Sequence, residues 1–312
     1  MSLTPFIAMQ YAVDIVNTSE HNSNKIAACL FQDDQWVAET NHRPDIFQFH
    51  FTPDIKFGQS SQFIHSETAC IFNTPFMTEG AEICITDPPC PNCAKAICEA
   101  GIDHVYIDHK GLGKDFVQRR GDDFESLSLL VFEKAGVNVS IIYRKEERLE
   151  PLITPPVATR KGSAQGIEFF DWDDDTTLRD YLSKFRQRQP HTSWALAKIR
   201  EGNKYLGIIL FEELTNGLTP RDYAEHRQRS EKYRLPVDPL NRILYFVKRK
   251  GMTIIDNEVA VNLYPSSRAL VNSVGFGLET IHIGEMKPDH DDQGHTAAQM
   301  IEKTGILKLI YL

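Results

Sequence analysis

The sequence predicts an α/β protein whose basic unit is a three-layer α/β/α fold with a mixed sheet, and it predicts that this unit is duplicated. Two observations indicate this fold class. Short apolar runs with strand character alternate with segments of helical pattern along the first half of the chain. A similar order of strand, turn, helix, glycine and strand then recurs in the second half.

The first half is expected to contain alternating helices and strands, in the order helix 4–16, strand 26–31, strand 35–40, helix 65–73, strand 82–86, helix 91–100, strand 104–107, helix 123–135 and strand 137–143. Pro91 takes the favoured first helical position, and Gly101 ends that helix. A helix separates the last two strands, so a hairpin is ruled out and the two strands are expected to be parallel.

Two short motifs carry the chemistry of this half. His65-Ser66-Glu67 opens one expected helix, and Pro89-Cys90-Pro91-Asn92-Cys93 opens the next. The two cysteines lie three apart at a helix start, so both thiolates face one way, and the helix dipole favours their negative charge. His65, Cys90 and Cys93 would give one Zn²⁺ three protein ligands. The open fourth position is typical of a catalytic site, where Glu67 would carry protons.

Each motif alone has a simpler interpretation. A lone C-x-x-C is also found as a redox pair or as half of a structural zinc site, and a lone H-x-E occurs by chance. The two motifs together, each at an expected helix start, favour the catalytic interpretation. We therefore expect an enzyme, a zinc-dependent hydrolase with one zinc per chain.

The combination resembles the H-x-E…P-C-x-x-C signature of zinc-dependent nucleobase deaminases. Over its whole first half the chain resembles the cytidine deaminase-like superfamily. A helix between the last two strands is similar to the deoxycytidylate and tRNA-adenosine branches. The run from Ile85 to Ile97, with Ala100-Gly101-Ile102, most resembles deoxycytidylate deaminases. Pro88 stands where base and tRNA deaminases usually carry glutamate.

The resemblance implies hydrolytic deamination of a cytosine nucleotide or nucleoside, with a small-molecule substrate and a homodimer. It implies that Asn41, in Asn41-His-Arg-Pro44, contacts the sugar, although the segment also fits a simple turn. Ser66 and Pro89, beside the metal ligands, are expected to contact the substrate. Two alternatives remain: a deaminase of another base, guanine or tRNA adenosine, and a zinc-stabilised binding or regulatory protein without turnover. The intact Glu67 argues against the second.

The second half aligns with the first at an offset of 176 residues. Glu258–Pro265 falls on Glu82–Pro89, and Thr280–Ile283 falls on His104–Ile107. Near the ends the offset changes: Lys303-Thr-Gly305 matches Lys134-Ala-Gly136, and Leu210-Phe211 matches Leu30-Phe31.

The metal ligands are not repeated in this alignment. Cys90 aligns with Ser266, Cys93 with Ala269, His65 with Asn241 and Glu67 with Ile243. The second half is therefore expected to lack zinc. Its C-terminal run, 306–312, aligns with the strand at Val137 and is expected to lie inside the second sheet.

These features predict a deaminase-like domain at 1–145, a linker with a short helix at 146–190 and a degenerate domain at 191–312. Glu150–Pro156 and Arg160–Ser163 have the composition of an extended linker. Asp173-Asp-Asp175 would cap a helix at 176–187, and a metal site is the less favoured interpretation of this triplet.

An aromatic insert at 45–64 carries Phe47, Phe49, Phe51, Phe57 and Phe63. The alternation over 47–51 would suit an extra strand. The insert is expected to form a small satellite core, with a cover over the base pocket as the alternative. His42 and Arg43 would either meet a phosphate or lie in a solvated turn.

The composition is that of a globular protein, with 41% hydrophobic and 25% charged residues. No apolar run approaches the roughly 20 residues that span a bilayer, and no secretory signal is visible. A reduced, cytoplasmic setting is therefore expected for the six cysteines. The net charge of −9 disfavours a polynucleotide substrate, although a local basic patch would permit one.

Overall fold

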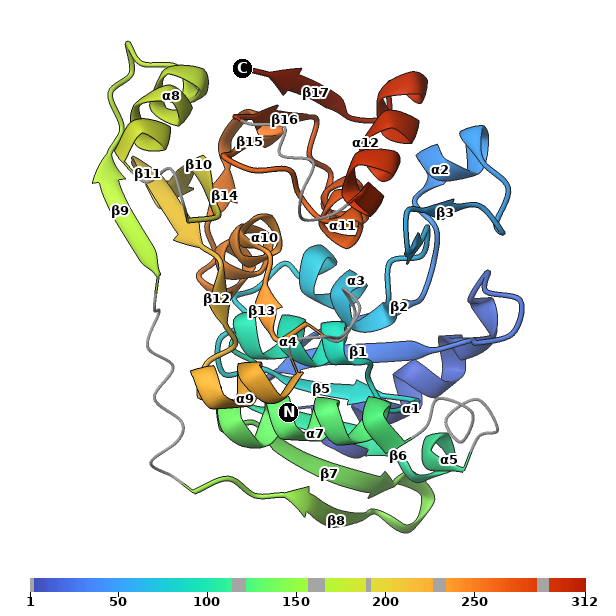
Figure 1. Ribbon diagram of the computed structural model, residues 1–312. Coiled ribbons are helices and arrows are strands. Elements are labelled where there is room, and N and C mark those ends of the chain that lie inside the picture. The colour runs from blue at the N-terminus through green and yellow to red at the C-terminus, as the bar shows by residue number, and fades with distance from the viewer. Residues whose placement is uncertain (1–2, 114–121, 157–165, 189–191, 227–233, 285–291) are drawn as a thin grey trace.

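The computed structural model describes residues 3–113, 122–156, 166–188, 192–226, 234–284 and 292–312 (Figure 1). The first half holds α1 (Pro5–Ile15), β1 (Ala27–Gln32), β2 (Gln35–Thr40), α2 (Asp45–His50), β3 (Lys56–Phe57), β4 (Ser60–Ser61), α3 (Ser66–Asn73), β5 (Glu82–Ile85), α4 (Pro91–Glu99), β6 (His104–Asp108), α5 (His109–Leu112), α7 (Asp122–Ala135), β7 (Asn138–Tyr143) and β8 (Arg148–Ile153). Its main sheet has the order β2-β1-β5-β6-β7-β8.

The second half holds β9 (Ile167–Asp171), α8 (Leu178–Arg188), β10 (Trp194–Glu201), β11 (Lys204–Phe211), β12 (Glu213–Leu214), α9 (Pro220–His226), β13 (Pro236–Val237), α10 (Pro239–Arg249), β14 (Thr253–Ile254), β15 (Glu258–Val261), α11 (Ser267–Phe276), β16 (Thr280–Ile283), α12 (Asp292–Thr304) and β17 (Lys308–Tyr311). Its sheet has the order β9-β11-β10-β15-β16-β17, and β14 also pairs with β10.

The two sheets have the same topology over five strands. In both, an antiparallel hairpin lies beside a third antiparallel strand, and two parallel strands follow: β2-β1-β5-β6-β7 in one sheet and β11-β10-β15-β16-β17 in the other. The helix that precedes the last strand ends at a glycine of positive φ in both halves, Gly136 and Gly305. The two halves therefore share one order and direction of strands over these five positions.

The expected elements of the first half are all present, and their bounds differ from the expectation by one residue at most at either end. The mixed α/β fold is confirmed, and β6 and β7 are parallel as expected. The proposed match of Leu210-Phe211 with Leu30-Phe31 was wrong, because β11 occupies the place of β2, and β10 that of β1.

The segment between the halves differs from the expected linker. Residues 148–153 pair with β7 as edge strand β8, and 167–171 pair with β11 as β9, so each sheet takes one strand from it. Residues 160–163 lie outside the described part of the chain. The short helix is present as α8, preceded by a turn in which the Asp173 carboxylate accepts from Asp175 N and Thr176 Oγ1.

Two further expectations were wrong. Residues 45–50 form helix α2 rather than a strand, because Phe47 and Phe51 are four apart and both pack on Phe57. β17 lies at the edge of the described sheet instead of inside it, since no strand takes the place that β8 has beside β7.

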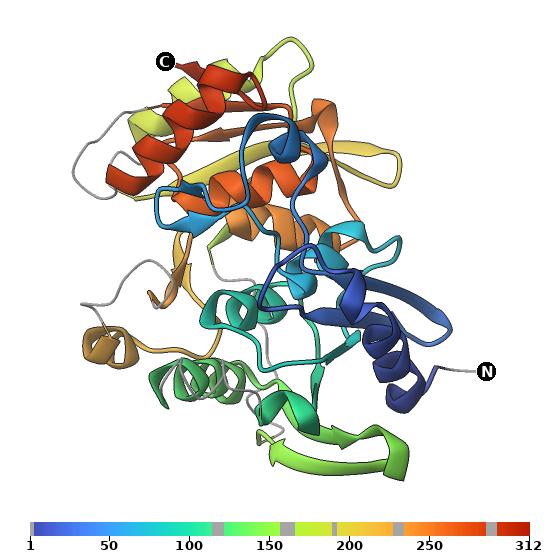
Figure 2. The same cartoon turned by 90° about the vertical axis from the view of Figure 1, so that its right-hand side faces the viewer.

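The helices form layers on both faces of each sheet. α1 covers one face of the first sheet, and α3, α4 and α7 cover the other; α8 lies on the outer face of the second sheet, opposite α10 and α11. Both views place α10 and α11 against α3 and α4, between the two sheets (Figure 1 and Figure 2). The largest apolar core is continuous across this boundary, so the halves fold against each other.

Polar contacts fix the two halves in register. The Arg242 guanidinium lies 3.1 Å from the Glu99 carboxylate, and both side chains are largely buried. Lys95 Nζ donates to the Arg234 carbonyl at 2.7 Å, and Arg249 pairs with Glu79 at 2.7 Å. Loss of one partner of a buried pair leaves an uncompensated charge, so these contacts specify one docking geometry. Among the described residues, no helix is both long and apolar enough to cross a membrane.

Candidate metal centre

Two helix starts bring the expected metal ligands together. His65 is the N-cap of α3, Cys90 is the N-cap of α4, and Pro91 occupies the first position of α4. Cys93 follows one turn later on the same face of α4. α4 follows the inner strand β5, whereas α3 follows the hairpin β3–β4, and the fold brings the N-termini of the two helices together.

The three ligand atoms fit a tetrahedral zinc. His65 Nδ1 lies 3.1 Å from Cys93 Sγ and 3.6 Å from Cys90 Sγ, and the two sulfurs are 3.5 Å apart. Tetrahedral bonds of about 2.0–2.1 Å to nitrogen and 2.3 Å to sulfur place ligand atoms roughly 3.5–3.8 Å apart. The two distances to Cys90 Sγ lie in this range, and the His65–Cys93 pair is closer and would have to open slightly around the ion. Among the described residues this is the one His/Cys/Asp/Glu group that brings three ligand atoms together. Burial raises the pKa of the Cys93 thiol well above its usual range, so a cation is needed to hold the thiolate.

Glu67 stands beside this group without belonging to it. It lies in the first turn of α3 and is 3% exposed, and its carboxylate accepts from Ser66 Oγ at 3.2 Å. Burial raises the pKa of the Glu67 carboxyl, while the neighbouring His65 acts in the opposite direction. A raised pKa suits a group that both takes up and returns a proton near neutral pH.

A pocket opens beside the ligands. Residues from three stretches of the chain line it: His21, Asn24, Ile26, Asn41, Ser61, Phe63, His65, Ser66 and Glu67. The structure therefore brings Asn41, Ser66, His65 and Glu67 to one cavity. Pro89 is buried outside the lining of this pocket, and its carbonyl accepts from Ser128 Oγ at 3.0 Å.

The segment after β2 is held firmly by the chain itself. Asn41 Oδ1 accepts from Ser19 Oγ and Ile26 N, and its Nδ2 donates to the Asn24 carbonyl. Asn41 therefore has one remaining amide hydrogen for a ligand. Arg43 is neither in a solvated turn nor facing the pocket, because its guanidinium is buried against Gln62 and backbone carbonyls of the insert.

The aromatic insert contributes to both the core and the site. Phe47 and Phe57 are fully buried in the main core rather than in a separate satellite, and Phe49 is 85% exposed. Phe63 lines the pocket, and its ring lies 4.7 Å from that of His21. His21 carries no motif that would identify it in the sequence, because it lies in an irregular segment before β1 and reaches the pocket only through the fold.

The second half holds a different set of residues at the corresponding place. The N-cap positions of the helices identify the corresponding residues. Ser266, the N-cap of α11, corresponds to Cys90, the N-cap of α4. Asp238, the N-cap of α10, corresponds to His65, the N-cap of α3. The alignment of His65 with Asn241 was therefore wrong, since α10 begins one turn earlier than a constant offset requires. Ala269 corresponds to Cys93, so no zinc ligand set is present there.

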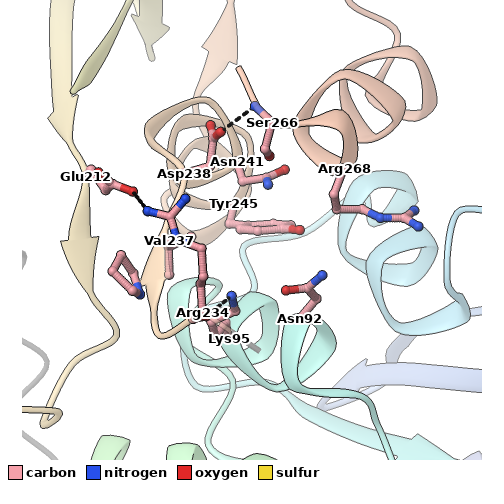
Figure 3. A pocket seen from close by; sticks show the side chains of 11 residues that line it. Asn92, Lys95, Glu212, Arg234, Val237, Asp238, Asn241, Tyr245, Ser266 and Arg268 are labelled. Carbon is pink, nitrogen blue, oxygen red and sulfur yellow. Dashed lines mark hydrogen bonds and ion pairs between the residues drawn. The ribbon is translucent and has the colours of Figure 1, made fainter. Parts of the chain in front are cut away.

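These counterparts line a second, polar pocket between the halves (Figure 3). The Asp238 carboxylate accepts from Leu240 N at 2.9 Å and from Ser266 N at 3.0 Å. A single carboxylate thus links the starts of α10 and α11, where a metal would link α3 and α4. Burial raises the pKa of Asp238 to about 6, although the hydrogen bonds from the two backbone N–H groups act to lower it.

Comparisons with known proteins agree with this geometry. Residues 7–109 match the family model described as the cytidine and deoxycytidylate deaminase zinc-binding region. An uncharacterized deaminase from the luxG 3' region of Aliivibrio fischeri is 36% identical over 77 residues, which are 25% of this chain and 50% of that protein. The chain thus spans about half the length of this curated relative.

Two solved structures show a more distant likeness. The dCMP deaminase of cyanophage S-TIM5, in complex with dCMP and dUMP, is 22% identical, covers 43% of this chain and 93% of its own, and has a TM-score of 0.31. A structure from a study of tRNA:A34 deaminases is 20% identical, covers 32% of this chain and 70% of its own, and has a TM-score of 0.21. At these TM-scores neither likeness bears on the substrate.

The first half of the chain thus combines a mixed α/β sheet with a His/Cys/Cys ligand group. Residues 7–109, which include His65, Cys90 and Cys93, match the zinc-binding region of cytidine and deoxycytidylate deaminases.

Proposed function

We propose that this chain is a zinc-dependent hydrolytic deaminase of a cytosine nucleotide or nucleoside, yielding the uracil form and ammonia. The observation that carries the proposal is the convergence of His65, Cys90 and Cys93 beside a buried, non-ligating Glu67 in a pocket. A structural zinc site has no use for that carboxylate, whereas a hydrolytic site requires a proton carrier.

One zinc ion, held by His65 Nδ1 and the two thiolates, would supply a water of lowered pKa, about 7. The chain's own residues would do the rest. Glu67 would take a proton from the attacking water and return protons to the ring nitrogen and to the departing amine. Ser66, which donates to the Glu67 carboxylate, would hold it in place. Water adds at carbon 4 of the ring and the C–N bond breaks, so ammonia is the second product.

The proposed substrate class rests on three features. The parallel pair β6 and β7 is shared with the deoxycytidylate and tRNA-adenosine branches. Within these branches, the residues from Ile85 to Ile97 most resemble deoxycytidylate deaminases. The remaining amide hydrogen of Asn41 and the aromatic wall of Phe63 would suit a sugar hydroxyl and a base, respectively.

The second half would be a duplicated deaminase-like domain that has lost its metal site. The shared sheet topology and the Asp238–Ser266 link in place of a ligand set support this proposal. The homodimer and the cytoplasmic location expected from the sequence stay predictions. None of the six cysteines forms a disulfide, as a reducing compartment would allow.

Ammonia release from a substrate panel tests the proposal. The zinc-replete chain should release ammonia from a cytosine nucleotide or nucleoside, and Glu67→Gln, which retains the shape but cannot accept the proton, serves as the matched control. Release only from guanine or from tRNA would replace the proposed substrate by the alternative base. No release from bases, nucleosides, nucleotides or tRNA would favour a non-catalytic zinc protein.

A further inference from the structure

One wall of the metal-site pocket is a short segment, residues 60–64, that both halves of the chain hold in place. Ser61 and Phe63 line the pocket, and the segment runs directly into the ligand His65. Within the first half, its regular backbone pairing consists of the two-residue hairpin β3–β4 and an isolated bridge between His42 and Ile64. The Gln62 side chain adds hydrogen bonds to Arg43 Nε and to the Thr52 and Ile55 carbonyls, so contacts from the second half act together with this support.

Helix α11 provides the contacts from the second half. Arg268 Nη1 donates to the Phe63 carbonyl at 2.9 Å, and Nη2 lies 3.4 Å from both the carbonyl and the hydroxyl of Ser61. Buried Ser267 and Ser60 hydroxyls are 3.1 Å apart. These contacts join residues more than 200 positions apart in the chain.

The fit between α11 and the wall is close. A Cβ atom at Gly275 would lie 2.5 Å from Ile64 Cδ1, so a glycine at this helical position allows Ile64 to pack against the helix. Arg268 also lines the polar pocket of the second half, where Figure 3 shows its side chain extending from α11 towards the first half. Its guanidinium thus stands between the two corresponding pockets.

We propose that Arg268 is a positioning residue for the metal-site pocket. The second half, which lacks the zinc ligands, would thereby position residues 60–64 of the first half. The planar guanidinium is suited to this role, because two of its N–H groups reach two backbone carbonyls at once, whereas a lysine ammonium reaches them as a point charge. The kinetic test of this inference rests on the proposed function, because it needs a substrate. The hydrogen-exchange test does not.

Steady-state kinetics of Arg268→Ala and Arg268→Lys test the proposal, with Arg221→Ala as the control. Arg221 is exposed on α9 and pairs with Glu225. Because the wall lines the pocket proposed for substrate and carries no proton-transfer group, Arg268→Ala should raise KM about 10-fold or more, with kcat changed far less and zinc content unchanged. The KM of Arg268→Lys should lie between those of the wild type and Arg268→Ala, and the KM of Arg221→Ala should match that of the wild type.

Hydrogen exchange gives a readout that needs no substrate. The Ile64 amide donates to the His42 carbonyl at 2.9 Å, so peptides covering 60–65 should exchange faster in Arg268→Ala and at the wild-type rate in Arg221→Ala. Unchanged KM and unchanged exchange in a folded Arg268→Ala would overturn the inference. So would a loss confined to kcat. If Arg268→Ala does not fold, the KM and the hydrogen exchange of Arg268→Lys test the inference instead. If the wild type releases no ammonia, the proposed function fails, and exchange still tests Arg268.

Discussion

Replacing Asp238 by asparagine should remove one component of the pH dependence of stability. The Asp238 carboxyl is buried, and burial raises its pKa from 3.8 to about 6. Below pH 3.8 it is protonated in both the folded and the unfolded chain. As the pH rises towards 6 the unfolded chain ionises first, so the folded state loses stability, and the loss is complete above the folded pKa.

The size of this component follows from the shift. One pKa unit corresponds to 1.36 kcal/mol, so a shift of about two units costs about 3 kcal/mol in the free energy of unfolding. Asparagine does not ionise. The stability of the wild type relative to Asp238→Asn should therefore fall by about 3 kcal/mol between pH 3.5 and pH 7.

Urea unfolding of both proteins at a series of pH values measures this difference. Asp34→Asn is a suitable control, because Asp34 is exposed in the turn between β1 and β2. A difference between wild type and Asp238→Asn that stayed constant with pH, or rose with it, would refute the assignment of a buried, ionising carboxylate as the link between α10 and α11.

Two further predictions concern the catalytic group and the last strand. Glu67→Gln should keep zinc and the melting temperature but lose about 10²–10⁴ in kcat, measured as ammonia release; loss of zinc would mean that Glu67 is a ligand. Deleting residues 306–312 should cause aggregation, seen by light scattering, because it removes β17 from its pairing with β16 and uncovers the core around Leu307. A truncated chain that stayed soluble with normal melting behaviour would show that this strand is dispensable.

Local signals were sufficient to predict that the side chains of His65, Cys90 and Cys93 lie close together. Cys90 followed by Pro91 is a helix start in sequence, and so is His65 followed by Ser66 and Glu67. A helix start fixes where a side chain points within one turn, so the approach of the two motifs depended only on the order of strands and helices.

Features set by distant contacts could not be predicted from the sequence. Phe47 and Phe51 fit both a strand and a helical face, and packing on Phe57 decides for the helix. Strands β8 and β9 form by pairing at sheet edges, although their residues have linker composition. A constant offset between the halves did not identify Asp238 as the counterpart of His65, because α10 begins one turn earlier than that offset requires. Arg268 gave no local signal at all, since its partners lie in the other half.

The zinc content of the purified chain tests the central claim most directly. Elemental analysis of the metal-replete wild type should give one zinc per chain, held by His65, Cys90 and Cys93, and Cys90→Ser should lose it. Cys98→Ser, which changes a cysteine of the same helix outside the ligand group, should retain the metal. No zinc in the wild type, two tightly held ions per chain, or full retention in Cys90→Ser would contradict the account.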